Sequence, residues 1–260
     1  MCYDEDSRPP IAPIAGGALD AARVTLTSED GALFSAFRAR AAQPTGAAIL
    51  ILPDARGLHA YFEELAARFA EQGVHALAID YFGRTAGLAP RQPDFDFMAH
   101  VPQTRWRTIA ADIRTGLTEL RSTSDGTARA LFTTGFCMGG RLAFLSGTLG
   151  LGLAGVIGFY GPPVGPSRDT PAPIDVVEQM DSPVLALWGG ADQAIRLEMT
   201  MAFDDALGLA GIEHRSITYP DAPHSFFDRK AADFAEASAA AWSETLAFIR
   251  AHSPKPGVSA

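Results

Sequence analysis

The sequence predicts an α/β fold, in which a doubly wound, mostly parallel sheet carries helices on both faces. Three observations support this prediction: strands and helices alternate along the chain, several strands are continuous apolar runs, and no internal repeat interrupts the pattern. Continuous apolar runs are typical of strands covered on both faces. Ligands of such sheets bind beyond the carboxyl ends of the strands, so the functional residues are expected in the loops that follow them.

The first half of the chain opens with a predicted hairpin. Segments 23–27 and 33–38 alternate around the turn residues 29–31, which is typical of a β-hairpin. Residues 83–102 include three prolines and predict a long loop, of the kind that is usually functional or mobile. The other elements expected here are a strand over 47–52, a helix over 62–72, a strand over 74–79 and a helix over 104–121.

The second half continues the alternation to a long closing helix. Its strands are short apolar runs, and two of them end in glycine-containing turns at Gly161 and Gly189. Such turns project side chains from the strand ends. The expected elements are a strand over 129–134, a helix that includes 141–145, a strand over 154–159, a helical turn over 174–180, a strand over 183–188, a helix over 196–209, a strand over 213–219 and a helix over 231–251.

Length and composition fit one large domain. The chain has 260 residues, of which 47% are apolar, enough for a core of several layers. We expect an irregular lead-in over 1–22, a single domain over 23–252 and a tail over 253–260. The net charge of −9 argues against nucleic acid or an anionic membrane as a partner. The sequence leaves monomer and homodimer open.

Cysteine usage and the N-terminal residues indicate a cytoplasmic location. The two cysteines, Cys2 and Cys137, make no disulfide framework and fit a reducing compartment. Residues 1–13 lack the apolar stretch of a signal peptide, so we expect a disordered terminus around Cys2. No apolar run reaches the length of a membrane span.

The stretch Gly135-Phe136-Cys137-Met138-Gly139-Gly140 joins a predicted strand to a predicted helix. A nucleophile flanked by glycines at such a turn is typical of a nucleophile elbow, here with Cys in place of Ser. The turn strains its central residue, and a side chain two positions away would clash. The following helix directs its unpaired N–H groups at the sulfur, which favours the thiolate. A buried Cys in a glycine-rich packing turn is the alternative interpretation.

Cys137, Asp192 and His224 fall at predicted strand ends on one rim, in the order that α/β-hydrolases use for nucleophile, acid and histidine. A thiol with an ordinary pKa of about 8.5 is mostly protonated at neutral pH, so a base must take its proton. Imidazole can do this, and a carboxylate on its other nitrogen fixes the tautomer. Asp221 is a rival acid, but three residues from His224 it is better placed to shape a turn.

Other histidines and a metal site are weaker candidates. His59 and His100 lie in rim loops and are candidates for substrate contact, whereas His75, His214 and His252 fit structural or exposed positions. A metal site would need paired ligands, and the chain has no C-x-x-C or H-x-x-x-H pair. We expect no metal and no cofactor.

From about Pro44 to the last helix, the sequence resembles the dienelactone hydrolases. A Cys nucleophile in this elbow is unusual among α/β-hydrolases, which makes the resemblance specific. It implies an α/β-hydrolase fold and cofactor-free hydrolysis of a small-molecule ester or enol-lactone, such as a dienelactone. The residues that resemble the family are 135–140, 189–192 and 224–226, together with 72–73, 80–84 and 158–161.

The resemblance also implies individual roles. It makes Cys137 the nucleophile, His224 the base and Asp192 the residue that orients it. The backbone N–H groups of Met138 and Ala55 would be the oxyanion donors, each typically contributing ~3–4 kcal/mol to lowering the barrier.

The implied substrate contacts are less regular. Arg84 matches a position that grips the substrate carboxylate, and a salt bridge that shapes its own loop is the alternative. Asp54 stands where the family's lactonases carry a Glu near the thiol, and it is one methylene shorter. Tyr160 is a further candidate contact. A second carboxylate-binding Arg is replaced by Asp228, with Arg229 one position later.

Two classes of function remain. The first is a hydrolase that forms a thioacyl-enzyme at Cys137, acting either as a narrow dienelactonase or as a general esterase for small esters. The second is a non-catalytic α/β-hydrolase scaffold that serves as a ligand sensor or thiol switch. A disulfide switch is disfavoured because no resolving cysteine lies nearby, whereas sulfenic acid chemistry stays open.

Overall fold

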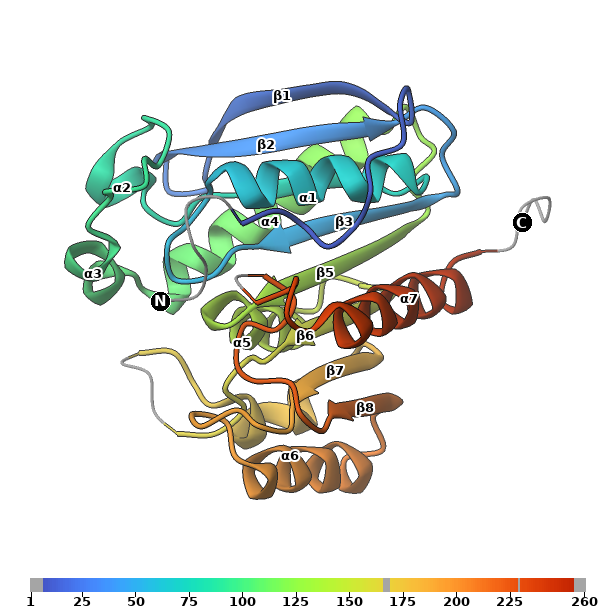
Figure 1. Cartoon of the computed structure of the whole chain (residues 1–260). Helices are drawn as coiled ribbons and strands as arrows, with labels where there is room; N and C mark the ends of the chain where they lie inside the picture. Colours follow the sequence, from blue (N-terminus) through green and yellow to red (C-terminus); the bar gives the residue numbers. More distant parts are fainter. Residues whose placement is uncertain (1–6, 166–168, 229, 255–260) are drawn as a thin grey trace.

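The computed structural model of the chain has three layers, with one sheet between two layers of helices (Figure 1). It describes residues 7–165, 169–228 and 230–254, so Cys2 and Arg229 lie outside the described residues. Within these ranges, eight strands pair in the order β1-β2-β4-β3-β5-β6-β7-β8. The β1–β2 and β2–β4 pairs are antiparallel, and the five other pairs are parallel. The expected mostly parallel sheet is confirmed.

The strands form where the sequence has continuous apolar runs. All residues of β3 (Ala47–Leu52) and β5 (Ala130–Phe136) are buried, and these two strands pair in the middle of the sheet. A strand covered on both faces must be apolar throughout, which is the reason that the runs predicted these strands. The other strands are β1 (Ala18–Thr27), β2 (Leu33–Ala41), β4 (His75–Ile79), β6 (Gly155–Phe159), β7 (Val184–Gly189) and β8 (His214–Tyr219).

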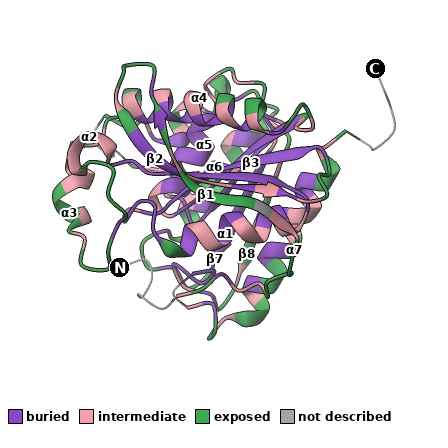
Figure 2. Ribbon diagram, turned by 90° about the horizontal axis from the view of Figure 1, so that it is seen from above, coloured by how far each residue is buried: buried purple, intermediate pink, exposed green. Residues whose placement is uncertain are grey.

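Two helical layers cover the sheet (Figure 2). Helices α1 (Ala60–Glu71) and α7 (Ala235–Ala251) share one face, where the rings of Phe69 and Trp242 lie 4.7 Å apart. Helices α5 (Met138–Ser146) and α6 (Leu197–Leu209) share the opposite face with α4 (Trp106–Thr123), and there Phe144 lies 5.0 Å from Phe203. Hydrophobic burial on both faces therefore fixes the sheet and the position of its rim.

Three expectations need correction. Residues 18–22, expected in the irregular lead-in, belong to β1, whose pairing is shifted between Leu19 and Ala22. Helix α7 begins at Ala235 rather than at 231, after a run of turns. The expected loop over 83–102 contains short helices, because its side chains bind it to the rim, as described below. These are α2 (Gly83–Ala86), α3 (Phe97–His100) and the 3₁₀ turn η1 (Val101–Gln103), and a longer 3₁₀ segment η2 (Pro173–Gln179) stands where a helical turn was expected.

Candidate active site

Parallel strands bring the three predicted catalytic residues to one rim of the sheet. Cys137 follows β5, Asp192 lies three residues after β7, and His224 lies five residues after β8. Because β5, β6, β7 and β8 run in the same direction, their carboxyl ends open onto the same edge, where ligands of such sheets bind.

The strand-to-helix turn at Cys137 has the strained geometry of a nucleophile elbow. Cys137 has φ 54° and ψ −115°, a left-handed backbone region that side chains rarely adopt. A Cβ atom on Gly135 would overlap the backbone of Gly139, so the turn closes only because position 135 carries glycine. Helix α5 begins at Met138 and directs its first N–H groups and positive dipole end at the thiol.

Aromatic packing joins the elbow to the loop that carries His224. The Phe136 ring stacks on Phe159 at 4.6 Å and on Phe227 at 5.8 Å. The Cys137 N–H donates a hydrogen bond to the Phe159 carbonyl at 3.1 Å. Phe136, next to Cys137, therefore packs against Phe227, which lies three residues after His224.

Asp192 and His224 form a hydrogen-bonded pair. Nδ1 of His224 lies 2.7 Å from Oδ2 of Asp192, whose side chain is only 1% exposed. The other oxygen, Oδ1, accepts the N–H groups of Ala194 at 2.8 Å and Ile195 at 3.0 Å. Burial raises the pKa of Asp192, but these bonds outweigh it, so the pKa of Asp192 lies below its usual range. Asp192 is thus ionised and fixed in place, and it is Asp192 rather than Asp221 that reaches this nitrogen.

Tyr160 lies against the imidazole of His224. Their ring centroids are 5.0 Å apart, and Tyr160 is fully buried with φ 36°. Its hydroxyl donates a hydrogen bond to Oδ2 of buried Asp228 at 2.9 Å. This contact places Asp228 near the histidine, although nothing in the sequence pairs it with Tyr160.

Two further hydroxyl groups fix the segment after His224. Tyr61, from α1, donates to the Phe227 carbonyl at 2.8 Å, and Ser238, from α7, donates to the Phe226 carbonyl at 2.9 Å. Together with Tyr160, which follows β6, these donors hold the three consecutive residues 226–228. Hydrogen bonds from elsewhere in the chain therefore anchor the irregular segment that follows His224.

The two expected oxyanion donors belong to segments that touch each other. A Cβ atom on Gly139 would overlap the carbonyl oxygens of Leu52 and Pro53, so the start of α5 packs directly on the chain that leads to Ala55. The first N–H groups of a helix have no acceptor within it, which applies to Met138. Within the described residues, the Ala55 N–H donates no hydrogen bond.

Asp54 is buried beside a histidine. Its Oδ1 accepts the Arg56 N–H at 2.8 Å and lies 3.9 Å from Nε2 of His59, while its Oδ2 has no hydrogen-bond partner among the described residues. Burial lowers the pKa of His59, and Asp54 offsets this only in part. Burial also raises the pKa of Tyr81, to which Asp54, Asp80 and Cys137 all add. Asp54 and Cys137 therefore both lie within electrostatic range of the Tyr81 phenol.

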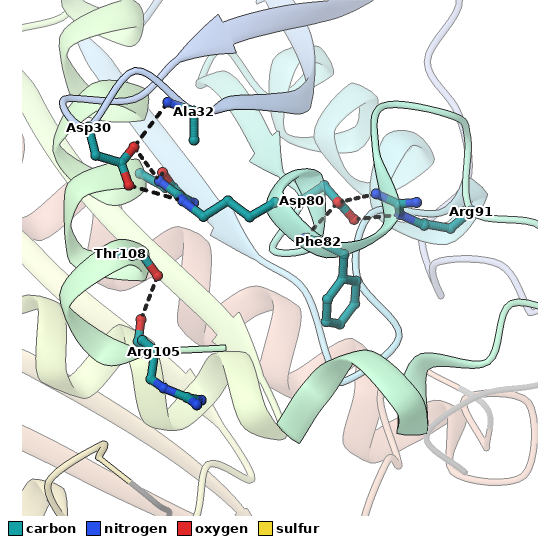
Figure 3. Close-up of polar contacts among 9 residues, drawn as sticks. Asp30, Ala32, Asp80, Phe82, Arg91, Arg105 and Thr108 are labelled. Atoms are coloured by element: carbon teal, nitrogen blue, oxygen red, sulfur yellow. Dashed lines mark hydrogen bonds and ion pairs between the residues drawn. The ribbon is translucent and has the colours of Figure 1, made fainter. Parts of the chain in front are cut away.

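Arg84 is held by two carboxylates. Its guanidinium binds Asp112 at 2.6 and 2.8 Å, and Asp30 at 2.9 and 3.1 Å. The bonds to Asp112, together with those to Asp30, raise the pKa of Arg84 further above its usual value. Asp30 also accepts the Ala32 N–H at 3.1 Å (Figure 3). This geometry matches the salt-bridge alternative that the sequence left open.

The remaining histidines lie in packing or surface positions. His100 stacks on Phe95 at 5.1 Å within the 83–102 segment. His75 accepts the Ala41 N–H at 3.2 Å, at the far end of β4. In the described part of the chain, no group of three or more His, Cys, Asp or Glu side chains is arranged to hold a metal ion.

The fold and the rim geometry define an α/β-hydrolase. The model of the dienelactone hydrolase family matches residues 34–253. The chain belongs to this family and is a hydrolase of carboxylic esters.

Similar proteins cover nearly the whole chain. A Salmonella typhimurium protein named "Putative carboxymethylenebutenolidase" is 27% identical over 95% of this chain and 95% of its own length. A Methylorubrum extorquens protein of the same name is 29% identical over 83% and 75%. The crystal structure of a "Putative Dienelactone Hydrolase" from Klebsiella pneumoniae is 26% identical, with a TM-score of 0.78 over 88% of this chain and 98% of that one. No described helix is long and apolar enough to cross a membrane.

Proposed function

We propose that the protein hydrolyses a small carboxylic ester or enol-lactone through a thioacyl-enzyme at Cys137, without a cofactor. His224 takes the thiol proton while the sulfur attacks the ester carbonyl, and Asp192 stabilises the resulting imidazolium. The N–H groups of Met138 and Ala55 receive the oxyanion of the tetrahedral intermediate. The observation that carries this proposal is the 2.7 Å contact between His224 and buried Asp192, on the rim that bears the strained Cys137.

The same groups complete acylation and then carry out deacylation. The ester C–O bond breaks, and the leaving oxygen takes the proton from His224, which leaves an acyl group on the sulfur. His224 then removes a proton from water, whose oxygen attacks the thioester carbonyl. The C–S bond breaks, the carboxylic acid departs, and the thiolate regains its proton from His224.

Two substrate classes compete. The relatives named as carboxymethylenebutenolidases favour an enol-lactone that bears a carboxylate. The ion pairs of Arg84 with Asp30 and Asp112 favour a general esterase for neutral small esters, because an Arg bound to two carboxylates has little capacity for a third. Asp228, where the resemblance expects a second Arg, supports the same reading.

One set of assays tests both the thioacyl mechanism and the substrate class. Wild type, Cys137→Ala and His224→Ala are compared on p-nitrophenyl acetate and on an enol-lactone that carries a carboxylate. Loss of turnover in both variants supports the mechanism, and full activity in either rejects it. A higher kcat/KM on the neutral ester favours the general esterase, and a higher value on the anionic lactone favours a carboxylate clamp.

We place the enzyme in the cytoplasm on the basis of its cysteine usage. Its partner is a small-molecule substrate, and it acts as a monomer or a homodimer. An intact site that binds a small molecule but hydrolyses no ester in a broad panel would favour the ligand-sensor alternative.

A further inference from the structure

Asp80 and Arg91 form a buried ion pair at the carboxyl end of β4 (Figure 3). Nη2 of Arg91 lies 2.7 Å from Oδ2 of Asp80, and its Nε lies 3.2 Å from Oδ1. The side chain of Arg91 is 5% exposed and that of Asp80 is 1% exposed. Two parallel bonds between planar groups in a buried position make a contact of fixed geometry.

The Asp80 carboxylate also accepts hydrogen bonds from two backbone segments, the loop after β3 and the turn after β4. Oδ1 of Asp80 accepts the Leu58 N–H at 3.0 Å, and Oδ2 accepts the Phe82 N–H at 2.8 Å. Gly57, with φ 79°, passes so close that a Cβ atom there would lie 2.6 Å from Oδ1 of Asp80 and 2.9 Å from the Phe82 ring. Residues 53–59, which we call the oxyanion loop, therefore rest directly on Asp80.

A second contact holds the beginning of the oxyanion loop. The hydroxyl of Tyr81, the residue after Asp80, donates to the Pro53 carbonyl at 2.8 Å. The loop is thus fixed at Pro53 and at Leu58 by two consecutive residues at the end of β4. Ala55 lies between these two anchored points, so the position of its N–H depends on them.

Arg91 itself belongs to the 83–102 segment and binds that segment to this arrangement. Its Nη2 donates to the Gly87 carbonyl at 2.6 Å and its Nη1 to the Ala86 carbonyl at 3.3 Å. The guanidinium also lies 4.9 Å from the centre of the Phe95 ring, a favourable distance for a cation–π contact. Arg91 thereby neutralises Asp80 and packs the segment over it.

We propose that Arg91 is a positioning residue for catalysis: through Asp80 it fixes the oxyanion loop, so that the Ala55 N–H is aimed at the developing oxyanion. The proposal rests on the proposed function and adds to it a residue that touches neither substrate nor nucleophile. Without Arg91, Asp80 is a buried charge that lacks its counter-charge. Water or neighbouring donors then compete for its oxygens, and the loop loses its anchor at Leu58.

The test separates oxyanion stabilisation from thiol reactivity. Arg91→Ala is assayed for kcat on p-nitrophenyl acetate, for Ki with a trifluoromethyl ketone and for alkylation of Cys137 by iodoacetamide. The ketone forms a tetrahedral thiol adduct whose oxyanion needs the N–H donors, whereas alkylation needs only the thiolate. We expect kcat to fall and Ki to rise by a similar factor of about ten to a hundred, with alkylation within about twofold of wild type.

Arg105→Ala is the matched control. Arg105 is exposed, and within the described residues its side chain donates to the carbonyls of Pro102 and Thr104, near the other end of the segment. All three measurements should stay within about twofold of wild type. If Arg91→Ala does not fold, Asp80→Asn provides the same comparison, because it keeps the size of the side chain and removes the charge that Arg91 binds.

Two results would overturn the proposal. One is a folded Arg91→Ala with kcat and Ki unchanged. The other is alkylation that slows in parallel with kcat, which would indicate general damage to the site. A wild type that neither binds the ketone nor loses activity on alkylation would instead reject the proposed function, and the positioning role with it.

Discussion

Nδ1 of His224 lies 2.7 Å from Oδ2 of Asp192, although the two residues are 32 positions apart in the chain. A hydrogen bond at this nitrogen leaves Nε2 as the site that exchanges protons with a substrate or nucleophile. Asp192 can act in this way because the hydrogen bond with His224, together with two backbone N–H groups on its other oxygen, holds its pKa below the usual range despite its burial.

Asp192→Asn should lower kcat on p-nitrophenyl acetate by about 10³- to 10⁴-fold with little change in fold, because an amide stabilises the wrong imidazole tautomer and no imidazolium. Asp221→Asn, an exposed acid three residues from the base, is the control and should stay near wild type. Steady-state kinetics on both variants decides the matter. A large loss in Asp221→Asn and a small one in Asp192→Asn would reverse the assignment.

Stability should depend on pH through His59. Burial holds the pKa of His59 below its ordinary value of 6.5, so the unfolded chain binds a proton that the folded protein accepts only at lower pH. The free energy of unfolding should therefore fall as pH drops below about 6.5. Urea unfolding at about pH 8 and about pH 5.5 should show a smaller difference in His59→Gln than in wild type. An equal difference in the two proteins would contradict this role.

Gly139→Ala should destabilise the fold and abolish activity. Its Cβ atom would overlap the carbonyl oxygens of Leu52 and Pro53, which cannot move without shifting the oxyanion loop. We expect a loss of about 3 kcal/mol or more in unfolding free energy. Gly147→Ala, at the end of the same helix, would meet its nearest atom at 3.3 Å and should stay within about 1 kcal/mol of wild type. Denaturant unfolding of both variants tests the contrast, and equal losses would count against the close approach.

Tyr160→Phe should weaken both stability and turnover. It removes the hydroxyl that donates to buried Asp228 at 2.9 Å, and it loosens a ring that packs on His224. The expected cost is about 1–3 kcal/mol, with a fall in kcat of roughly tenfold. Tyr219→Phe is the control, because the Tyr219 hydroxyl has no hydrogen-bond partner among the described residues. Thermal unfolding and kinetics that showed the same effect in both variants would argue against a specific tether.

The sequence predicted the sheet well because each central strand is a local pattern. The apolar run at Ala47–Leu52 can hardly be placed anywhere but inside a sheet, and β3 has these bounds. β1 begins earlier than predicted. Its first residues pair irregularly and lack the alternation that marks a strand, so the sequence pattern did not indicate them. The short helices of 83–102 are held by contacts such as the ion pair between Arg91 and Asp80, and no local pattern records these.

The candidate site likewise has residues that a local motif predicts and contacts that only the folded chain brings together. Cys137 and its glycines form a local motif, so the elbow could be read directly from the chain. The partners of Arg84 could not, because Asp30 is 54 positions away and Asp112 is 28 positions away. The tether from Tyr160 to Asp228 spans 68 positions and depends on how the last loop folds back on β6. Only the tertiary arrangement reveals such pairs.

The most direct test of the central claim is mass spectrometry of the protein quenched during turnover of p-nitrophenyl acetate, a substrate whose acyl transfer is fast. The account predicts one acetyl group on the peptide that contains Cys137, present in wild type and absent from Cys137→Ala. Turnover in wild type with the acetyl group on another residue, or undiminished hydrolysis by Cys137→Ala, would contradict it.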